Sequence, residues 1–339
     1  MSSLNSSPRR SRRFVPATLG LAATMLLAAC SGDLPQPEAE RAAAAPEPVL
    51  TQEQLDAVLD DVEVELTTGD ASMNPDDLGS RITGTAREIR AAEYLIEAAD
   101  PARPITLLPR EDSMVIVPAS NDWPRDIVVI TEPPAESQIP RVMVLQQETP
   151  RDNFALTLWS QLLPGVSMPA MPLPTEGAQP LENDAEGFAL APGEVGDAFT
   201  DVLSGKKADD EDSQVELFAE DPLSTAIRDE YKTLKDGISA VGSVKKTFEA
   251  AEDPVAAFEA LEGGAIVITS VQEITNFKID SGSLNVSSDA AVLLDKESIS
   301  SKLETVHELS LVFYVPPENS DDEITILGET RDLVEAAGK

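Results

Sequence analysis

The sequence predicts an α+β protein made of two units, each with helices packed on a curved antiparallel sheet. Apolar residues at helical spacing are followed by runs of β-branched residues, and this order of helices and then strands occurs twice. Hydrophobic residues make up 42% of the chain and aromatic residues only 4%, so aliphatic side chains must fill the cores. A length of 339 residues suits two domains.

The first unit, residues 49–164, is expected to begin with two helices. Thr51 and Gln54 have the spacing of a capping box, and apolar residues follow at helical spacing as far as Leu66. A second helix is expected to begin at Asn74-Pro75, because a cap residue there precedes a proline in the first turn, and to end at Pro101. Short turns then separate four β-rich runs, which predicts an antiparallel meander of strands at 114–119, 126–131, 141–147 and 154–163.

A connector rich in proline and glycine, residues 165–187, leads to the second unit, residues 188–339. Helix signals occur at 194–203, after Asp221-Pro222 and after Asp253-Pro254. The strands expected in this unit are residues 265–271, 274–279, 290–294, 308–315 and 323–327. The repeated order suggests a duplicated unit, although no residue-level repeat is evident.

This layout resembles the cystatin-like and NTF2-like architectures, in which helices pack on a curved antiparallel sheet. The chain is also similar in layout to uncharacterised actinobacterial lipoproteins, and its usage rich in Ala, Asp and Glu but poor in Lys fits that setting. Such folds host both enzymes and binding modules, so the resemblance implies no particular activity.

The N-terminus has the features of a secretion signal, residues 1–29. Four arginines and no acidic residue precede a short apolar run, Phe14 to Ala29. That run is shorter than the roughly 20 residues that span a bilayer. We therefore expect a cleaved signal peptide.

The signal ends in Leu27-Ala28-Ala29-Cys30, which resembles the lipobox of bacterial lipoproteins. The resemblance implies that the Cys30 thiol receives a diacylglycerol, with fatty acyl chains such as palmitate, and that cleavage occurs before Cys30. Two acyl chains are what stable anchoring requires. The expected location is the cell membrane, facing the extracytoplasmic side, with residues 30–48 as a flexible tether. The alternative is an ordinary secretory signal in which the cysteine is incidental.

Charge excludes one class of partner. Without residues 1–29 the chain has 21 basic and 61 acidic residues, a net charge near −40. Such a chain repels the phosphate backbone, so no nucleic-acid partner is expected. Cys30 is the only cysteine, so a disulfide within the chain is excluded.

No pattern in the sequence indicates catalysis, and no catalytic residue, cofactor or metal site is expected. His307 is the only histidine and lies at the end of an apolar strand face, where a structural role is usual. Ser204–Lys207 and Ser243–Lys246 match S-x-x-K, but the accompanying S-D-N and K-T-G motifs are missing. The acidic run 209–212 lacks the spacing and the glycine of a calcium loop.

The sequence therefore favours a non-catalytic interaction or assembly module of the cell envelope. Its expected partners are membrane lipid through Cys30 and an envelope protein. The alternatives are a carrier of a small apolar ligand or lipid and, with less support, an envelope hydrolase or isomerase. Trp123 lies in a turn before Pro124, where it either docks a partner or pins the loop to the core.

Overall fold

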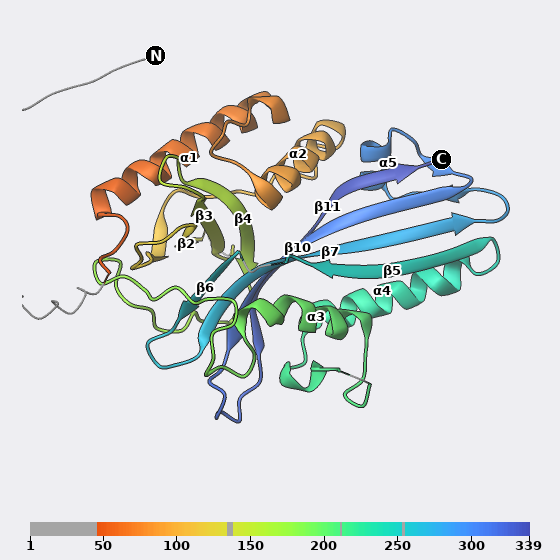
Figure 1. The fold of residues 1–339 in the computed structure, drawn as a ribbon. Helices are drawn as coiled ribbons and strands as arrows, with labels where there is room; N and C mark the ends of the chain where they lie inside the picture. The colour runs from red at the N-terminus through yellow and green to blue at the C-terminus, as the bar shows by residue number, and fades with distance from the viewer. Residues whose placement is uncertain (1–45, 134–137, 211, 253–254) are drawn as a thin grey trace, which may run out of the picture. The chain divides into compact units, whose positions relative to one another are not determined.

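The computed structural model describes residues 46–133, 138–210, 212–252 and 255–339. The predicted signal peptide, the predicted lipid site Cys30 and the predicted tether up to residue 45 lie outside the described residues. Residues Pro46–Lys339 form one compact unit. Its α+β class is as expected (Figure 1).

The described part of the chain contains five α-helices and eleven strands. The helices are α1 (Gln52–Ser72), α2 (Gly84–Ala99), α3 (Val195–Ser204), α4 (Pro222–Ile238) and α5 (Ser288–Leu294). The strands are β1 (Asp112–Ile116), β2 (Arg125–Thr131), β3 (Arg141–Gln147), β4 (Ala155–Leu162), β5 (Gly242–Ala250), β6 (Ala256–Glu259), β7 (Ala265–Ile279), β8 (Leu284–Asn285), β9 (Ser298–Ile299), β10 (Lys302–Val315) and β11 (Thr325–Gly338).

One antiparallel sheet runs through both halves of the chain. Its strand order is β1-β2-β3-β4-β11-β10-β7-β5, and β6 pairs with β7. The halves meet where β11 pairs with β4, with Gly328 opposite Leu162. A Cβ atom at position 328 would lie 2.9 Å from the carbonyl oxygen of Gln161, so glycine allows this close approach. The expected connector, 165–187, therefore does not separate two sheets.

The sheet bends so that its two halves pack against each other. Ile127 and Val129 of β2 join a core with α1 and α2, while Val128 and Ile130 join a different core with β7 and β10. Successive strand residues point to opposite faces, so β2 is covered on both. A third core holds α3 and α4 against the outer face of the second half. The helices of each half thus cover one face of their own strands (Figure 1).

The capping box at the start of α1 is confirmed. The Thr51 hydroxyl accepts a hydrogen bond from the Gln54 backbone at 3.3 Å, and the Gln54 side chain accepts one from the Thr51 backbone at 2.9 Å. Four residues of the expected apolar stripe are buried, namely Leu55, Leu59, Val62 and Leu66. Local capping and burial of one face together explain this helix.

Three expected elements are wrong in type or position, and the strands expected at 265–271 and 274–279 form the single strand β7. Pro75–Asp77 is a 3₁₀ turn, and the second helix begins only at Gly84. The expected strand 290–294 is the last part of α5, which Ser287 caps by accepting from the Ala290 backbone. The helix expected after residues 253–254, which lie outside the described residues, is replaced by β6. Pairing of β6 with β7 supplies backbone hydrogen bonds that a short isolated helix could not match.

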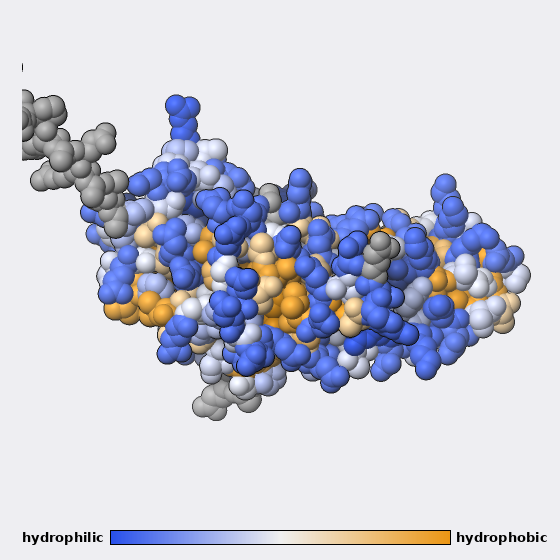
Figure 2. Space-filling view, turned by 60° about the horizontal axis from the view of Figure 1, so that its bottom comes forward, coloured by the Kyte–Doolittle hydropathy of each residue, from blue (hydrophilic) through white to orange (hydrophobic). Residues whose placement is uncertain are grey.

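No helix in the described part of the chain is long and apolar enough to cross a membrane. The side on which α3 and α4 lie is mostly hydrophilic, with apolar patches near its middle (Figure 2). This surface agrees with a sequence that contains 61 acidic residues.

Candidate functional site

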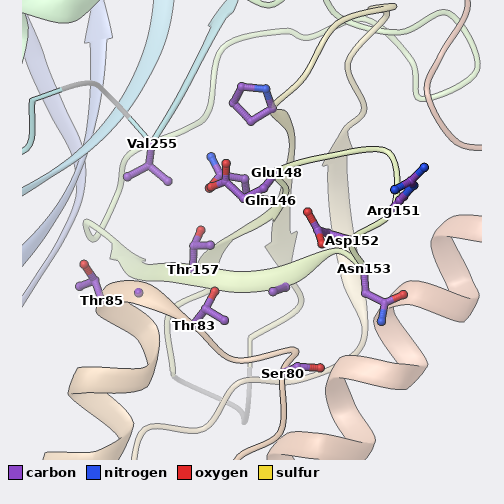
Figure 3. Close-up of a pocket in the computed structure, with 13 residues that line it drawn as sticks. Ser80, Thr83, Thr85, Gln146, Glu148, Arg151, Asp152, Asn153, Thr157 and Val255 are labelled. Carbon is purple, nitrogen blue, oxygen red and sulfur yellow. The ribbon is translucent and has the colours of Figure 1, made fainter.

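A pocket of about 860 Å³ lies between the start of α2 and the turn that joins β3 to β4 (Figure 3). Its lining is mainly polar. The hydroxyl side chains are Ser80, Thr83, Thr85 and Thr157, the amides are Gln146 and Asn153, and the charged residues are Glu148, Arg151 and Asp152.

Backbone pairing brings the first wall of the pocket together. The segment before α2 runs parallel to β4, where the Leu156 backbone N–H donates to the Arg81 carbonyl at 2.7 Å. The Thr83 N–H in turn donates to the Leu156 carbonyl at 2.9 Å. Thr83 is therefore held beside Thr157, although 74 positions separate them in the sequence. Figure 3 shows both side chains on the same side of the pocket.

Hydrogen bonds hold the opposite wall, which is the β3–β4 turn. The Thr149 hydroxyl donates to the Asp152 carboxylate at 2.6 Å, and the Gln147 amide donates to the Asp152 carbonyl at 2.8 Å. These bonds shape the turn that carries Arg151 and Asn153. In Figure 3 the three side chains Arg151, Asp152 and Asn153 lie together at one end of the pocket.

A partly buried carboxyl lies behind this wall. The Gln146 amide donates to Asp126 Oδ1 at 2.8 Å, and Gln146 itself lines the pocket. Burial raises the pKa of Asp126 to about 7, against a smaller lowering effect of the Gln146 hydrogen bond. The carboxyl therefore titrates well above the usual range of an aspartate, and its hydrogen bond holds the Gln146 side chain in place.

The chemistry of this pocket is that of recognition by hydrogen bonds. Hydroxyl and amide groups both donate and accept, and Thr83 makes no side-chain cap to α2, so its hydroxyl is left for other partners. The lining contains no histidine, cysteine or lysine. The carboxylates in the lining are Glu148 and Asp152, and within the described residues neither is hydrogen-bonded to a lining hydroxyl, as an activating base would be.

Sequence reasoning missed a buried ion cluster in the second half of the sheet. The Glu273 side chain is fully buried and accepts from Arg331 twice, at 2.7 Å each, and from Lys246. Glu230 of α4 is the fourth member of the cluster, and its Oε2 atom lies 2.8 Å from Arg331 Nη1. Burial raises the pKa of Glu273, but hydrogen bonds and charge from Arg331 outweigh it and hold the pKa below its usual value. Each buried charge is paired, which indicates a structural role.

His307 lies beside this cluster, opposite Glu273 in the β10–β7 register. Burial lowers the pKa of His307 to about 4, and the charge of Arg331 lowers it as well. Its Nδ1 atom has no hydrogen-bond partner among the described residues. It shares a pocket of about 320 Å³ with Arg331 and Asp332. The imidazole is neutral at pH 7, and no carboxylate in the described part of the chain orients it as a base by a hydrogen bond.

The S-x-x-K matches do not form Ser–Lys pairs within the described residues. Lys246 is bound to Glu273 and Glu230, whereas Ser243 is exposed at the start of β5. Ser204 donates to the Asp201 carbonyl at 3.0 Å, and Lys207 is exposed. Among the described residues, no group of three or more His, Cys, Asp or Glu side chains is placed to hold a metal ion. The acidic run 209–212 includes residue 211, which lies outside that description.

Trp123 serves partly to hold its own loop. Its ring stacks under the Arg125 guanidinium at 3.8 Å, and its Nε1 donates to Gln147 at 3.3 Å. The side chain is still 38% exposed, and the next residue, Pro124, lines the large pocket. Trp123 therefore holds its own loop, and the docking of a partner on its exposed part stays a prediction.

Comparison with known proteins identifies a family but no activity. No curated protein and no solved structure matches the chain. The family described as "Domain of unknown function (DUF8094)" matches residues 46–338, which include all of α1 to β11. Because the match covers both halves of the sheet and most of the sequence, the chain belongs to the DUF8094 family.

Proposed function

We propose that this protein is a lipid-anchored extracytoplasmic lipoprotein that acts as a non-catalytic interaction module of the cell envelope. The observation that carries the proposal is the large pocket beside α2, whose hydroxyl and amide lining suits recognition by hydrogen bonds. Its partner is a polar segment of an envelope component that exchanges hydrogen bonds with Thr83, Thr157 and Gln146.

The anchor in this proposal rests on the sequence. The arginines before Phe14, the short apolar run and the lipobox ending at Cys30 support acylation and cleavage at that residue. Residues 30–45 then act as the tether between the membrane and the compact unit that begins at Pro46, whereas residues 46–48, also expected in the tether, belong to that unit. The excess of acidic residues keeps the folded part away from anionic headgroups.

The proposal can be tested by photocrosslinking in the native membrane. A benzophenone amino acid at Asn153, an exposed position in the pocket wall, should give a discrete crosslinked product. The same group at Glu318, an exposed position between β10 and β11 outside the pocket, is the matched control. Equal labelling from both positions, or none from Asn153 in correctly localised protein, would reject the pocket as the interaction site.

Carriage of a small apolar ligand is a second candidate function. A different pocket, between α3, α4 and β5, favours it because its lining includes Leu203, Ile227 and Phe248. The same native-membrane preparation, analysed for bound small molecules, separates this candidate from the interaction module.

We also propose that the two halves arose by duplication of a cystatin-like or NTF2-like unit. In each half two helices precede four strands of the main sheet, and the order β1-β2-β3-β4 is followed by the reverse order β11-β10-β7-β5. That arrangement is what a two-fold axis through the β4–β11 contact produces. Superposition of α1–β4 on α3–β11 tests this idea, which fails if the helix pairs run in opposite directions after alignment.

A further inference from the structure

A second pocket, of about 430 Å³, lies between α3, α4 and β5. One side is apolar, with Leu203 and Ile227 each 1% exposed and Phe248 half-buried. The lining from α4 carries three cations, Arg228, Lys232 and Lys235, and one carboxylate, Asp236. The spacing of the cations, four and three residues, places them on one face of the helix.

Two of these cations form no ion pair within the described residues, not even with Asp236. No carboxylate in the described part of the chain lies within ion-pair distance of Lys232 or Lys235, and the Lys235 ammonium lies 5.4 Å from the Tyr231 ring centre. Arg228 donates to the Val202 carbonyl at 2.6 Å, at the end of α3. Lys246, also in the lining, is already bound to Glu273 and Glu230.

Unpaired lysines are unexpected in so acidic a chain. The protein has 61 acidic and 25 basic residues, so there are more than enough carboxylates to pair with every lysine and arginine. Six of its ten lysines nevertheless lie between residues 206 and 246, which include α4 and the loop before it. The distant negative charge is screened over about 8 Å at physiological ionic strength. An anion in the pocket therefore responds mainly to the nearby cations.

We propose that this pocket binds a small amphiphilic organic anion, independently of the large pocket beside α2. Its carboxylate or phosphate lies against Lys232 and Lys235, and its apolar body lies on Leu203, Ile227 and Phe248. The volume is within the range of small-molecule sites, about 300–1,000 Å³. The ligand chemistry combines one anionic group with a short apolar chain or ring.

The test is calorimetric titration of the full-length protein in a non-ionic detergent. Octanoate, octyl phosphate and 4-phenylbutyrate are the anionic probes, and they distinguish a chain from a ring and a carboxylate from a phosphate. Two further compounds are controls. Octanamide has the apolar chain but no charge, and inorganic phosphate has the charge but no apolar part. We expect saturable binding of at least one amphiphilic anion, with octanamide and inorganic phosphate at least about tenfold weaker.

A matched pair of double variants locates the site. Changing Lys232→Gln together with Lys235→Gln should weaken binding of the anion by about tenfold. The control changes Lys296→Gln and Lys302→Gln, which are exposed and outside the pocket but alter the net charge equally. Equal affinities of octanoate and octanamide, equal effects of the two double variants, or no saturable binding of any anionic probe would overturn the proposal. Heat from partitioning into micelles is common to all variants and does not produce the expected difference.

Discussion

Glu273 is the centre of the buried ion cluster in the second half of the sheet. Its carboxylate is fully buried, and only its contacts with Lys246 and Arg331 compensate for the loss of water. Because the cluster joins β5, β7, β11 and α4, removal of its negative centre affects four elements together.

We therefore expect Glu273→Gln to lower the free energy of unfolding by about 3–5 kcal/mol at pH 7. The pKa of Glu273 is lowered in the folded state, so its stabilisation is complete above the unfolded pKa near 4.5 and is lost as pH falls through the folded pKa. Denaturant titrations should show that the loss of stability caused by Glu273→Gln becomes smaller below pH 4. Glu249→Gln, on the exposed part of β5, is the control and should change stability by less than about 0.5 kcal/mol.

The pKa of Asp332 is shifted in the opposite direction from that of Glu273. Burial raises its pKa to about 7, with a further contribution from the charge of Glu93, and its Oδ2 atom has no hydrogen-bond partner in the described part of the chain. The folded protein therefore retains a proton that the unfolded chain releases near pH 4. The stability contributed by this group is largest below pH 4 and falls as pH rises to 7.

Asp332→Asn should consequently raise the free energy of unfolding by about 1–3 kcal/mol at pH 8 and have little effect near pH 3.5, below the unfolded pKa. Urea titrations at the two pH values measure the difference. Asp321→Asn, at an exposed turn, should show no such dependence on pH. A stabilisation of equal size at both pH values would mean that Asp332 titrates normally.

At the scale of elements, α1 tests local capping. Thr51→Ala removes the side-chain acceptor for the Gln54 backbone and should lower the free energy of unfolding by about 1 kcal/mol. Thr51→Ser keeps the acceptor and should stay within a few tenths of a kcal/mol. If both variants lost the same stability, the methyl group of Thr51 rather than its hydroxyl would be responsible.

Elements with local signals were predictable, and elements stabilised by distant pairing were not. The capping box and apolar stripe of α1 lie within 16 residues, so the sequence alone was sufficient. The strand β7 was expected as two strands because Gln272 and Glu273 interrupt its apolar run. Both polar residues have partners on strands that are distant in the sequence. The Gln272 amide donates to a Glu308 carboxylate oxygen at 2.6 Å, and Glu273 accepts from Arg331 Nε at 2.7 Å. The short apolar segment of α5 was expected as a strand, because apolar content alone does not distinguish a short strand from a short helix.

The large pocket had no sequence signal for a related reason. Its threonines, amides and turn residues form no motif, and only the pairing of residues 81–83 with β4 brings Thr83 beside Thr157. The uneven distribution of lysines was visible in the sequence, but the apolar floor between α3, α4 and β5 was not. The two candidate pockets therefore depend on tertiary contacts more than on motifs.

At the scale of the whole molecule, one sheet joins ranges that the sequence suggested as two units. The β4–β11 contact makes the halves continuous, and the family match spans both. The proposed lipid anchor can be tested apart from the fold, because Cys30 precedes the compact unit that begins at Pro46.

Cys30→Ala should move the protein from the membrane fraction to an unprocessed precursor or a released form. Loss of the acyl attachment removes the two chains that stable anchoring needs. Fractionation followed by immunoblotting measures the change, and Ser31→Ala, which leaves the lipobox intact, is the control. A Cys30→Ala protein that was still fully processed and membrane-bound would exclude lipidation at this residue.

The most direct single measurement is the intact mass of the protein extracted gently from its native membrane, recorded first under native and then under denaturing conditions. The account predicts a denatured mass that begins at Cys30 and includes a diacylglyceryl group, so that residues 1–29 are absent. A chain that retains those residues, or that begins elsewhere without acyl mass, would contradict the claim that this is a membrane-anchored lipoprotein.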